Sequence, residues 1–302
     1  MTAPRVSIGV PVFNGQVYLR RALDSMLAQD YQDYEVIISD NASTDDTAEI
    51  AREYAARDSR FRYFRNESNL GAAPNFNRVF ELSRGEFFKW LSCDDECHPE
   101  MLSRCLDVLS QAPPSVALVY PQCEIIDERS NSLGPLFEHV RSRSRLPHQR
   151  LARVLFKVHT VLSLLGVIRS TYLRRTRMRG SFIKDDRVLL AELALLGEIW
   201  EIPDVLWKIR FHDRNAHRLN RTVKDYMIWM DAANAGQRFL MPPSVRLFQE
   251  YLRGIRAAKL STTNKLACYA TVPIVHCLAP FRNFGGRQKL RLARLLAQSE
   301  GR

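Results

Sequence analysis

The chain has 302 residues, 46% of them hydrophobic and 25% charged, which is typical of a globular protein and excludes a disordered, collagenous or coiled-coil chain. Its net charge of +11 is unevenly distributed. Residues 1–138 hold 13 Lys and Arg against 22 Asp and Glu, whereas residues 139–302 hold 31 against 11. The basic second half predicts an anionic partner, which could be a nucleic acid, an anionic membrane or a phosphorylated substrate.

The first 120 residues alternate between two kinds of apolar pattern. Short apolar runs predict strands at residues 6–11, 34–40, 61–64, 87–91 and 116–120, and the first of these runs is rich in β-branched residues. Apolar residues at helical spacing predict helices at residues 17–29, 43–57, 73–83 and 99–111. This alternation indicates an α/β fold, with a mostly parallel, Rossmann-like sheet flanked by helices.

The alternation ends after residue 120. We expect a loop at 127–150, helices at 151–165 and 186–196, and a strand at 199–209. From residue 221 the pattern predicts helices to the end of the chain, closing with a basic amphipathic helix at 282–298. We therefore divide the chain into a Rossmann-like first part (1–120), a second part (121–220) and a basic helical C-terminal extension (221–302).

Targeting signals are absent from the sequence pattern. The N-terminus lacks a secretory signal, and the longest apolar stretch, residues 266–280, is short for a membrane span and broken by Pro273 and His276. We expect a cytoplasmic protein. Its basic residues 282–298 could lie on the inner face of a membrane as a peripheral contact, or pack on the domain instead.

Acidic residues follow two of the predicted strands. Asp40 ends the second strand, and Asp94 and Asp95 follow the fourth. Ligands of open α/β sheets bind outside the carboxyl ends of the strands, and paired carboxylates with substrate phosphates suit a hard cation such as Mg²⁺. The alternative is that Asp40 is a turn residue and that Asp94 and Asp95 cap the helix after Pro99.

An ordered set of motifs over residues 5–111 resembles the family 2 glycosyltransferases, which have the GT-A fold and invert the anomeric centre. The motifs are Pro11-Val12-Phe13-Asn14, Ser25-Met26-Leu27-Ala28-Gln29, Asp40-Asn41-Ala42-Ser43-Thr44-Asp45-Asp46-Thr47, Asn69-Leu70-Gly71, Gly85-Glu86-Phe87, and Ser92-Cys93-Asp94-Asp95 with Pro99. The resemblance implies that residues 1–120 bind a nucleotide-sugar and that residues 121–220 bind the acceptor.

The resemblance also implies roles for single residues. Asp94 and His212 would hold a divalent metal, Mg²⁺ or Mn²⁺, although His212 by itself could equally be a surface loop residue. The donor would be bound by Pro11, Phe13, Asn14, Asp40, Asn69, Ser92 and Asp95, with Phe13 packing on the base and Asp40 accepting one of its N–H groups. Ser92 replaces the first acid of the family's D-x-D pattern, which predicts weaker metal binding or its loss.

Asp185 and Asp186 precede a run of apolar residues that ends at Gly197. In the resembled family a carboxylate at this place is the general base, which implies Asp186 as the base and Asp185 as the second candidate. The alternative is that both are helix N-terminal residues. Arg210 could face phosphate, but we expect it to face solvent.

The function implied is transfer of a sugar from a nucleoside diphosphate donor, with UDP or dTDP favoured, to a saccharide or lipid-linked saccharide acceptor. Such an enzyme would serve bacterial-type polysaccharide or glycolipid assembly and would have no nucleic-acid partner. The alternative is a protein that binds nucleic acid or another anionic surface through its basic half. A nucleotidyltransferase is disfavoured, because residues 13–15 lack a Gly-rich loop with Arg and Lys.

Overall fold

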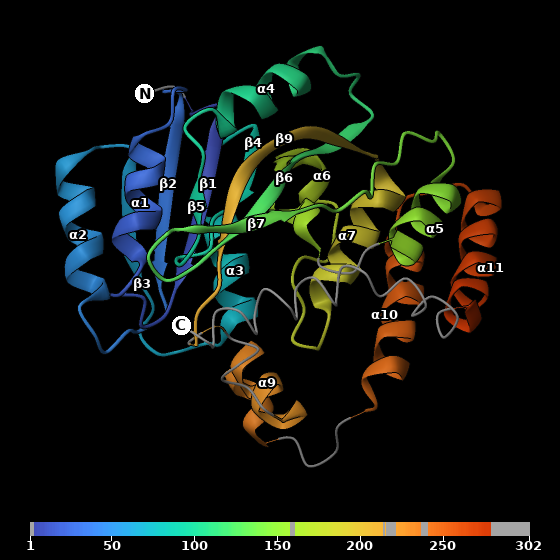
Figure 1. Cartoon of the computed structure of the whole chain (residues 1–302). Helices are drawn as coiled ribbons and strands as arrows, with labels where there is room; N and C mark the ends of the chain where they lie inside the picture. The colour runs from blue at the N-terminus through green and yellow to red at the C-terminus, as the bar shows by residue number, and fades with distance from the viewer. Residues whose placement is uncertain (1–2, 158–160, 214, 216–221, 237–240, 279–302) are drawn as a thin grey trace.

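The structure is a computed structural model that describes residues 3–157, 161–213, 215, 222–236 and 241–278 (Figure 1). The strands are β1 (Val6–Val12), β2 (Tyr34–Asp40), β3 (Phe61–Arg65), β4 (Phe87–Trp90), β5 (Glu96–Cys97), β6 (Val116–Ile126), β7 (Ser132–Leu136), β8 (Val167–Arg169) and β9 (Glu198–Arg210). The helices are α1 (Leu19–Leu27), α2 (Thr47–Arg57), α3 (Ala72–Glu81), α4 (Met101–Gln111), α5 (Pro147–Lys157), α6 (Ser170–Leu173), α7 (Asp185–Leu196), α9 (Val223–Met230), α10 (Pro243–Ala257) and α11 (Thr262–Leu278), with 3-10 turns η1 (Leu162–Leu165) and η2 (Ala232–Gly236).

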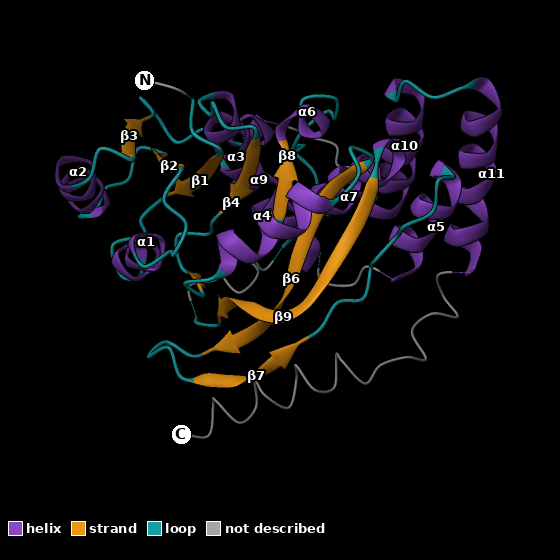
Figure 2. Ribbon diagram, turned by 90° about the horizontal axis from the view of Figure 1, so that it is seen from above, coloured by secondary structure: helices purple, strands orange, loops and turns teal. Residues whose placement is uncertain are grey.

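The strands form a curled sheet in the order β3-β2-β1-β4-β8-β6-β9-β5, with β7 paired to β6 (Figure 2). Strands β3, β2, β1 and β4 are parallel to one another. The short β8 runs antiparallel between β4 and β6, and β6 and β9 are again parallel. This mostly parallel sheet with helices on both faces confirms the α/β, GT-A-type architecture expected from the sequence.

Hydrophobic patterning explains the central elements. Every residue of β1 and β2 is buried, as expected for parallel strands that are covered on both faces. In α1 the buried residues are spaced three or four apart, so the helix presents one apolar stripe to the sheet; they are Leu19, Ala22, Leu23 and Met26.

Two hydrophobic cores lie on the two faces of the sheet. Helices α1, α2 and α4 contribute to the first, and α3, α5, α7, α10 and α11 to the second. Gly9 allows α3 to approach β1 closely, because a Cβ there would lie 2.5 Å from Val79 Cγ2. Because α10 and α11 contribute to the second core, the described part of the C-terminal extension (221–302) shares this core with α5 and α7.

The topology places a switch point at one edge of the sheet. Strand β1 has β2 on one side and β4 on the other, so the strand order reverses there, and ligands bind at the carboxyl ends beside such a switch point. Helix α7 packs on the sheet and leads through Gly197 into β9, whose first residue pairs with the first residue of β6. The C-terminus of α7 thus lies at the opposite edge, and its N-terminus lies at the carboxyl edge.

Several elements differ from the expectation. Strand β6 extends to Ile126, β7 lies within the expected loop 127–150, and β5 and β8 were not predicted. The expected helix 151–165 is α5, which begins earlier at Pro147, followed by the separate turn η1. The basic segment 282–298 lies outside the described residues. Within the part of the chain that the structure describes, no helix combines the length and the apolar character that a membrane span requires.

Candidate active site

The loops after β1 and β2 are joined by hydrogen bonds at the carboxyl edge. The backbone N–H of Asn14 donates to Ser43 Oγ at 2.9 Å, and the Thr44 N–H donates to Asn14 Oδ1 at 2.8 Å. Asn14 has a φ of 50°, which turns the chain directly after the strand. Pro11 is buried within β1, whereas the Phe13 side chain is 44% exposed. Of these residues, Phe13 is the one with a ring open to a ligand.

Asp40 ends β2 with a fully buried carboxylate. Its Oδ1 accepts the Ser43 backbone N–H at 2.8 Å. Its Oδ2 accepts the Tyr63 hydroxyl at 2.9 Å and Arg65 Nη1 at 2.5 Å. Arg65 is opposite Asp40 in the β2–β3 register, and its side chain is 40% exposed. Arg65 therefore lies between the Asp40 carboxylate and solvent.

Asn69 is held within its own loop. Its Oδ1 accepts Asn41 Nδ2 at 2.8 Å and the Gly71 backbone N–H at 2.9 Å. Gly71 has a φ of +93°, and a Cβ at this position would lie 2.5 Å from the Cα of Asp231. The loop before α3 consequently packs directly against the end of α9.

Asp94 and His212 meet after β4 and β9. Asp94 Oδ2 lies 3.0 Å from His212 Nε2 and 3.3 Å from Asn215 Nδ2. The His212 ring packs on Tyr18 with a centroid separation of 4.6 Å. Burial opposes ionisation of Asp94, but hydrogen bonds from His212 and Ser92 outweigh it and hold the pKa of this carboxyl below its usual value. The structure therefore brings three of the expected residues, Ser92, Asp94 and His212, together.

Asp95 faces β9. Its Oδ1 accepts the backbone N–H of Arg210 at 2.9 Å, and its Oδ2 accepts Trp207 Nε1 at 3.2 Å. Burial, with the charge of Asp94 next to it, raises the pKa of Asp95 well above its usual value. The carboxylate thus ties the loop after β4 to β9.

Arg210 does not face solvent, contrary to the expectation from the sequence. Its side chain is fully buried, and its Nε donates to the Asp94 carbonyl at 2.9 Å. The guanidinium also donates to the Asp127 carbonyl at 2.7 Å, to Ser130 Oγ at 3.0 Å and to the Glu96 carboxylate. Arg210 therefore joins the loop that carries Asp94 to the loop between β6 and β7.

Asp185 and Asp186 form the first turn of α7, after Lys184 in the left-handed conformation at φ 66°. Asp185 is 1% exposed and ion-paired with Arg179, whose Nη2 lies 3.0 Å from its Oδ1. Burial raises the pKa of Asp185, although the Arg179 charge opposes the shift. Asp186 is half-buried, and its Oδ1 accepts the Arg187 backbone N–H at 2.7 Å. The two carboxylates therefore have different environments.

The sequence did not identify several residues that build this edge. Four of them are Tyr18, Arg65, Arg179 and Asn215, whose side chains contact His212, Asp40, Asp185 and Asp94, respectively. The register of β2 and β3 would have placed Arg65 beside Asp40. For the other three, the sequence holds no signal of the contact, because each contact depends on how the loops fold.

Comparisons with known proteins agree with this architecture. The sequence model of glycosyl transferase family 2 matches residues 7–169. The putative glycosyltransferase EpsH of Bacillus subtilis is 36% identical over 273 residues, which is 89% of this chain and 73% of EpsH. A Campylobacter jejuni protein named GalNAc(5)-diNAcBac-PP-undecaprenol beta-1,3-glucosyltransferase is 37% identical over 130 residues, covering 42% of this chain and 40% of that protein.

The chain spans about a quarter of an uncharacterised Rickettsia felis glycosyltransferase (24%), to which it is 34% identical over 49% of its own length. Solved structures share its fold. TarS 1–349 of Staphylococcus aureus with UDP-GlcNAc superposes with a TM-score of 0.64 at 17% identity, covering 93% of this chain and 74% of TarS 1–349. A Pyrobaculum calidifontis mannosyltransferase with GDP-Man and Mn²⁺ gives 0.55 at 18% identity, covering 100% and 81%. With a family match over more than half of its length, the chain belongs to glycosyl transferase family 2.

Proposed function

We propose that the chain is an inverting glycosyltransferase that moves a sugar from a nucleoside diphosphate sugar to an acceptor hydroxyl. Asp186 takes the proton of the hydroxyl, the oxygen attacks the anomeric carbon, and the bond to the diphosphate breaks, so the nucleoside diphosphate leaves with inversion. The observation that carries this proposal is that α7 starts at the same sheet edge where Asp94 and His212 meet.

Asp186 suits the role of base better than Asp185 does. Asp185 is buried and bound by Arg179, so an acceptor hydroxyl has poor access to it. Asp186 is half-buried and can still accept a proton from a bound hydroxyl. Arg179 in turn is fixed by Asn77 of α3, whose Oδ1 accepts the Arg179 backbone N–H at 3.0 Å. Asp185 would therefore position the first turn of α7, and Asp186 would react.

The metal proposal rests on Asp94 and His212. Their 3.0 Å separation equals the distance between adjacent ligands around an octahedral ion with bonds of about 2.1 Å. Among the described residues, no group of three His, Cys, Asp or Glu side chains forms a metal site, so donor phosphates and water would complete the coordination. When bound, Mg²⁺ or Mn²⁺ would neutralise the charge that develops on the departing diphosphate. Ser92, which carries no charge, would bond the ribose instead.

The preference for UDP or dTDP rests on Phe13 and Asp40. Hydrogen bonds from described residues use three of the roughly four lone pairs of the Asp40 carboxylate. The remaining lone pair could accept the N–H of a uracil or thymine ring. Since Asp40 is fully buried, the base would reach it only when Arg65 moves aside. Pro11 and Asn14 would then act by shaping the loop behind Phe13, and Asn69 by holding the loop before α3.

A saccharide or lipid-linked saccharide acceptor in bacterial-type polysaccharide or glycolipid assembly fits this proposal. Support comes from the C. jejuni relative, whose name specifies an undecaprenol-linked substrate, and from the positive charge of residues 139–302. A cytoplasmic location with peripheral contact to the membrane belongs to the same proposal.

A thermal-shift panel of UDP, dTDP and GDP and their sugars, with and without Mn²⁺, tests the donor proposal. A ligand at about 100 times its Kd stabilises by about 2.7 kcal/mol, which raises the Tm by several degrees. We expect this shift for UDP or dTDP ligands with Mn²⁺, its loss in Asp94→Asn, and its retention in the exposed control Asp107→Asn. A panel without any shift, or an Asp94→Asn variant that responds like the wild type, would contradict the proposal.

A further inference from the structure

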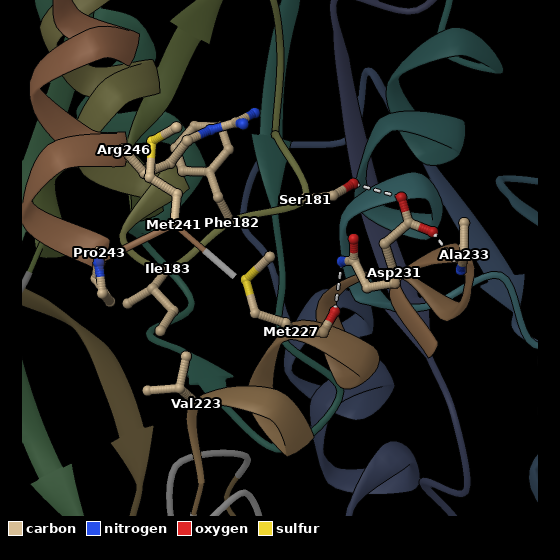
Figure 3. Close-up of a pocket in the computed structure, with 11 residues that line it drawn as sticks. Ser181, Phe182, Ile183, Val223, Met227, Asp231, Ala233, Met241, Pro243 and Arg246 are labelled. Carbon is tan, nitrogen blue, oxygen red and sulfur yellow. Dashed lines mark hydrogen bonds between the residues drawn. The ribbon is translucent and has the colours of Figure 1, made fainter. Parts of the chain in front are cut away.

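A cavity of about 380 Å³ lies between the segment before α7, helix α9, turn η2 and the start of α10 (Figure 3). Its apolar walls are Phe182, Ile183, Val223, Met227, Met241 and Pro243. The side chains come from three separate parts of the chain and converge on the same space (Figure 3). The volume is at the lower end of the range for sites that bind small organic ligands.

The polar groups at the cavity are largely engaged with one another. Ser181 Oγ donates to Asp231, whose Oδ1 accepts the Ala233 backbone N–H at 2.9 Å. Asn234 Nδ2 donates to the Met227 carbonyl at 2.7 Å. A sugar ring needs many hydrogen-bond partners, whereas an apolar ligand leaves these existing bonds intact. The chemistry of the cavity therefore favours an apolar ligand.

Arg246 covers one side of the cavity without offering it an isolated charge. Its guanidinium carbon lies 5.4 Å from the centre of the Phe182 ring, and its Nε lies 2.9 Å from Glu250 Oε1. Glu250 is 2% exposed and also binds Arg177 and Arg253. Arg246 thus shares the single negative charge of Glu250 with Arg177 and Arg253, and its guanidinium lies next to the Phe182 ring.

The cavity adjoins both halves of the proposed reaction site. Ser181 and Ile183 directly precede the first turn of α7, which carries the proposed base. On the other side, the Ala232 backbone N–H donates to the Leu70 carbonyl at 3.2 Å, in the loop before α3. A ligand in the cavity would therefore lie beside the place where an acceptor hydroxyl must meet Asp186.

We propose that this cavity binds an alkyl chain of the acceptor next to the sugar that is glycosylated. The inference rests on the proposed function, because it is the transfer reaction that requires an acceptor. Met227 and Met241 suit a flexible chain, since methionine side chains adapt to irregular apolar shapes. The small volume accommodates a short stretch of chain and not an entire lipid.

The test uses the full chain labelled at its methionine methyl groups with ¹³C, titrated with n-octyl β-glucoside below its micelle concentration. The matched ligand is methyl β-glucoside, which has the same sugar and lacks the chain. We expect saturable shifts of the Met227 and Met241 methyl signals with the octyl ligand and much smaller ones with the methyl ligand. Met26 and Met101 are fully buried in the core beneath the sheet and serve as internal controls, with signals that stay in place.

A matched pair of variants locates the binding. Val223 and Val245 lie in the first turns of α9 and α10 and are 45% and 46% exposed, but Val223 lines the cavity and Val245 does not. Val223→Trp fills the space and should weaken octyl glucoside binding about tenfold or more, whereas Val245→Trp should leave it unchanged.

Signals of Met227 and Met241 that do not move, or that respond equally to both glucosides, would overturn the proposal whether or not the protein transfers sugar. Equal loss of binding in both tryptophan variants would overturn it as well. Transfer is measured separately, so failure of the glycosyltransferase proposal would be recognised by the lack of nucleotide release while the methionine shifts remain.

Discussion

Asp94 and Asp95 are adjacent in the sequence, but their carboxylates have different partners. Asp94 faces His212 and Asn215 at the carboxyl edge of the sheet, and its side chain is 21% exposed. Asp95 is 5% exposed and accepts hydrogen bonds from Trp207 and Arg210 of β9. The first is available to a ligand, and the second holds the loop in place.

Asp95→Ala should therefore lower stability more than it alters ligand chemistry. It would leave the Trp207 indole N–H and the Arg210 backbone N–H buried without an acceptor, which costs about 1–3 kcal/mol. Urea unfolding of the variant measures the loss. Asp94→Ala is the matched control, and we expect it to lose less stability than Asp95→Ala but more Mn²⁺-dependent nucleotide binding. A greater loss of stability in Asp94→Ala together with a greater loss of binding in Asp95→Ala would contradict these two roles.

The sequence predicted the single residues at the ends of strands but not the side chains that contact them. Asp40, Asp94 and Asp186 could be found because buried strands and an apolar helix locate them, and the family resemblance gives them roles. The contacts of Tyr18, Arg179 and Asn215 could not, since each joins segments whose approach depends on the folded sheet. Arg210 was misjudged because a cation in a basic sequence gives no sign of the acceptors that surround it.

Among the elements, β1, β2 and β3 are joined by one buried carboxylate in addition to their ladders. Glu35 of β2 accepts Ser7 Oγ at 2.7 Å, Arg62 Nη1 at 2.7 Å and Arg84 Nη2 at 2.8 Å. Burial opposes its ionisation, but the hydrogen bonds from Arg84, Ser7 and Arg62 hold the pKa of Glu35 below its usual value. The charged form is thus the one that joins the first three strands and the segment before β4.

Glu35→Gln should destabilise the protein by about 1–3 kcal/mol at neutral pH, because the amide turns a donor toward the arginines. The folded pKa is depressed, so the contribution is present above the unfolded pKa, near 4.5, and is lost as the pH falls through the folded value. Urea unfolding between pH 7 and pH 3 should therefore show a shallower loss for Glu35→Gln than for the wild type. An unchanged acid slope would refute this role, and the exposed Glu81→Gln should follow the wild type.

Long strands could be predicted from the sequence, whereas short strands could not. Strands β1 and β2 each bury seven consecutive residues, a run long enough to recognise. Strands β5 and β8 have two and three residues and exist because β9, β4 and β6 supply their partners. Strand β7 contains Gly134 and Pro135, which signal a loop in the sequence, yet it pairs with β6.

For the whole molecule, some of the cations that make residues 139–302 basic bind acceptors inside the protein. Arg150 donates to the carbonyls of Ala194 and Leu195 at the C-terminus of α7, where a cation is favourable. Arg177 bridges Glu192 and Glu250, and Arg210 is fully buried. The positive surface of residues 139–302 is consequently smaller than the residue count suggests.

Residues 279–302, which the structure does not describe, carry six Lys and Arg against one Glu. If they supply the peripheral membrane contact, truncation after residue 278 should release the protein from vesicles that contain phosphatidylglycerol. Added salt should have the same effect, because it screens exposed charge. Flotation measures both, and neutral phosphatidylcholine vesicles are the control. Equal binding by the truncated and the full chain would exclude this segment as the anchor.

The proposed roles meet in Asp186, because the first turn of α7 must bring the base to the acceptor hydroxyl that attacks a donor bound beside β1 and β4. The most direct test is Asp186→Asn, measured for nucleoside diphosphate release in the presence of acceptor and, separately, for donor binding. The account predicts a loss of transfer of about 10²-fold to 10⁴-fold with donor affinity retained. Wild-type turnover in Asp186→Asn, or a loss of donor binding equal to the loss of transfer, would contradict it.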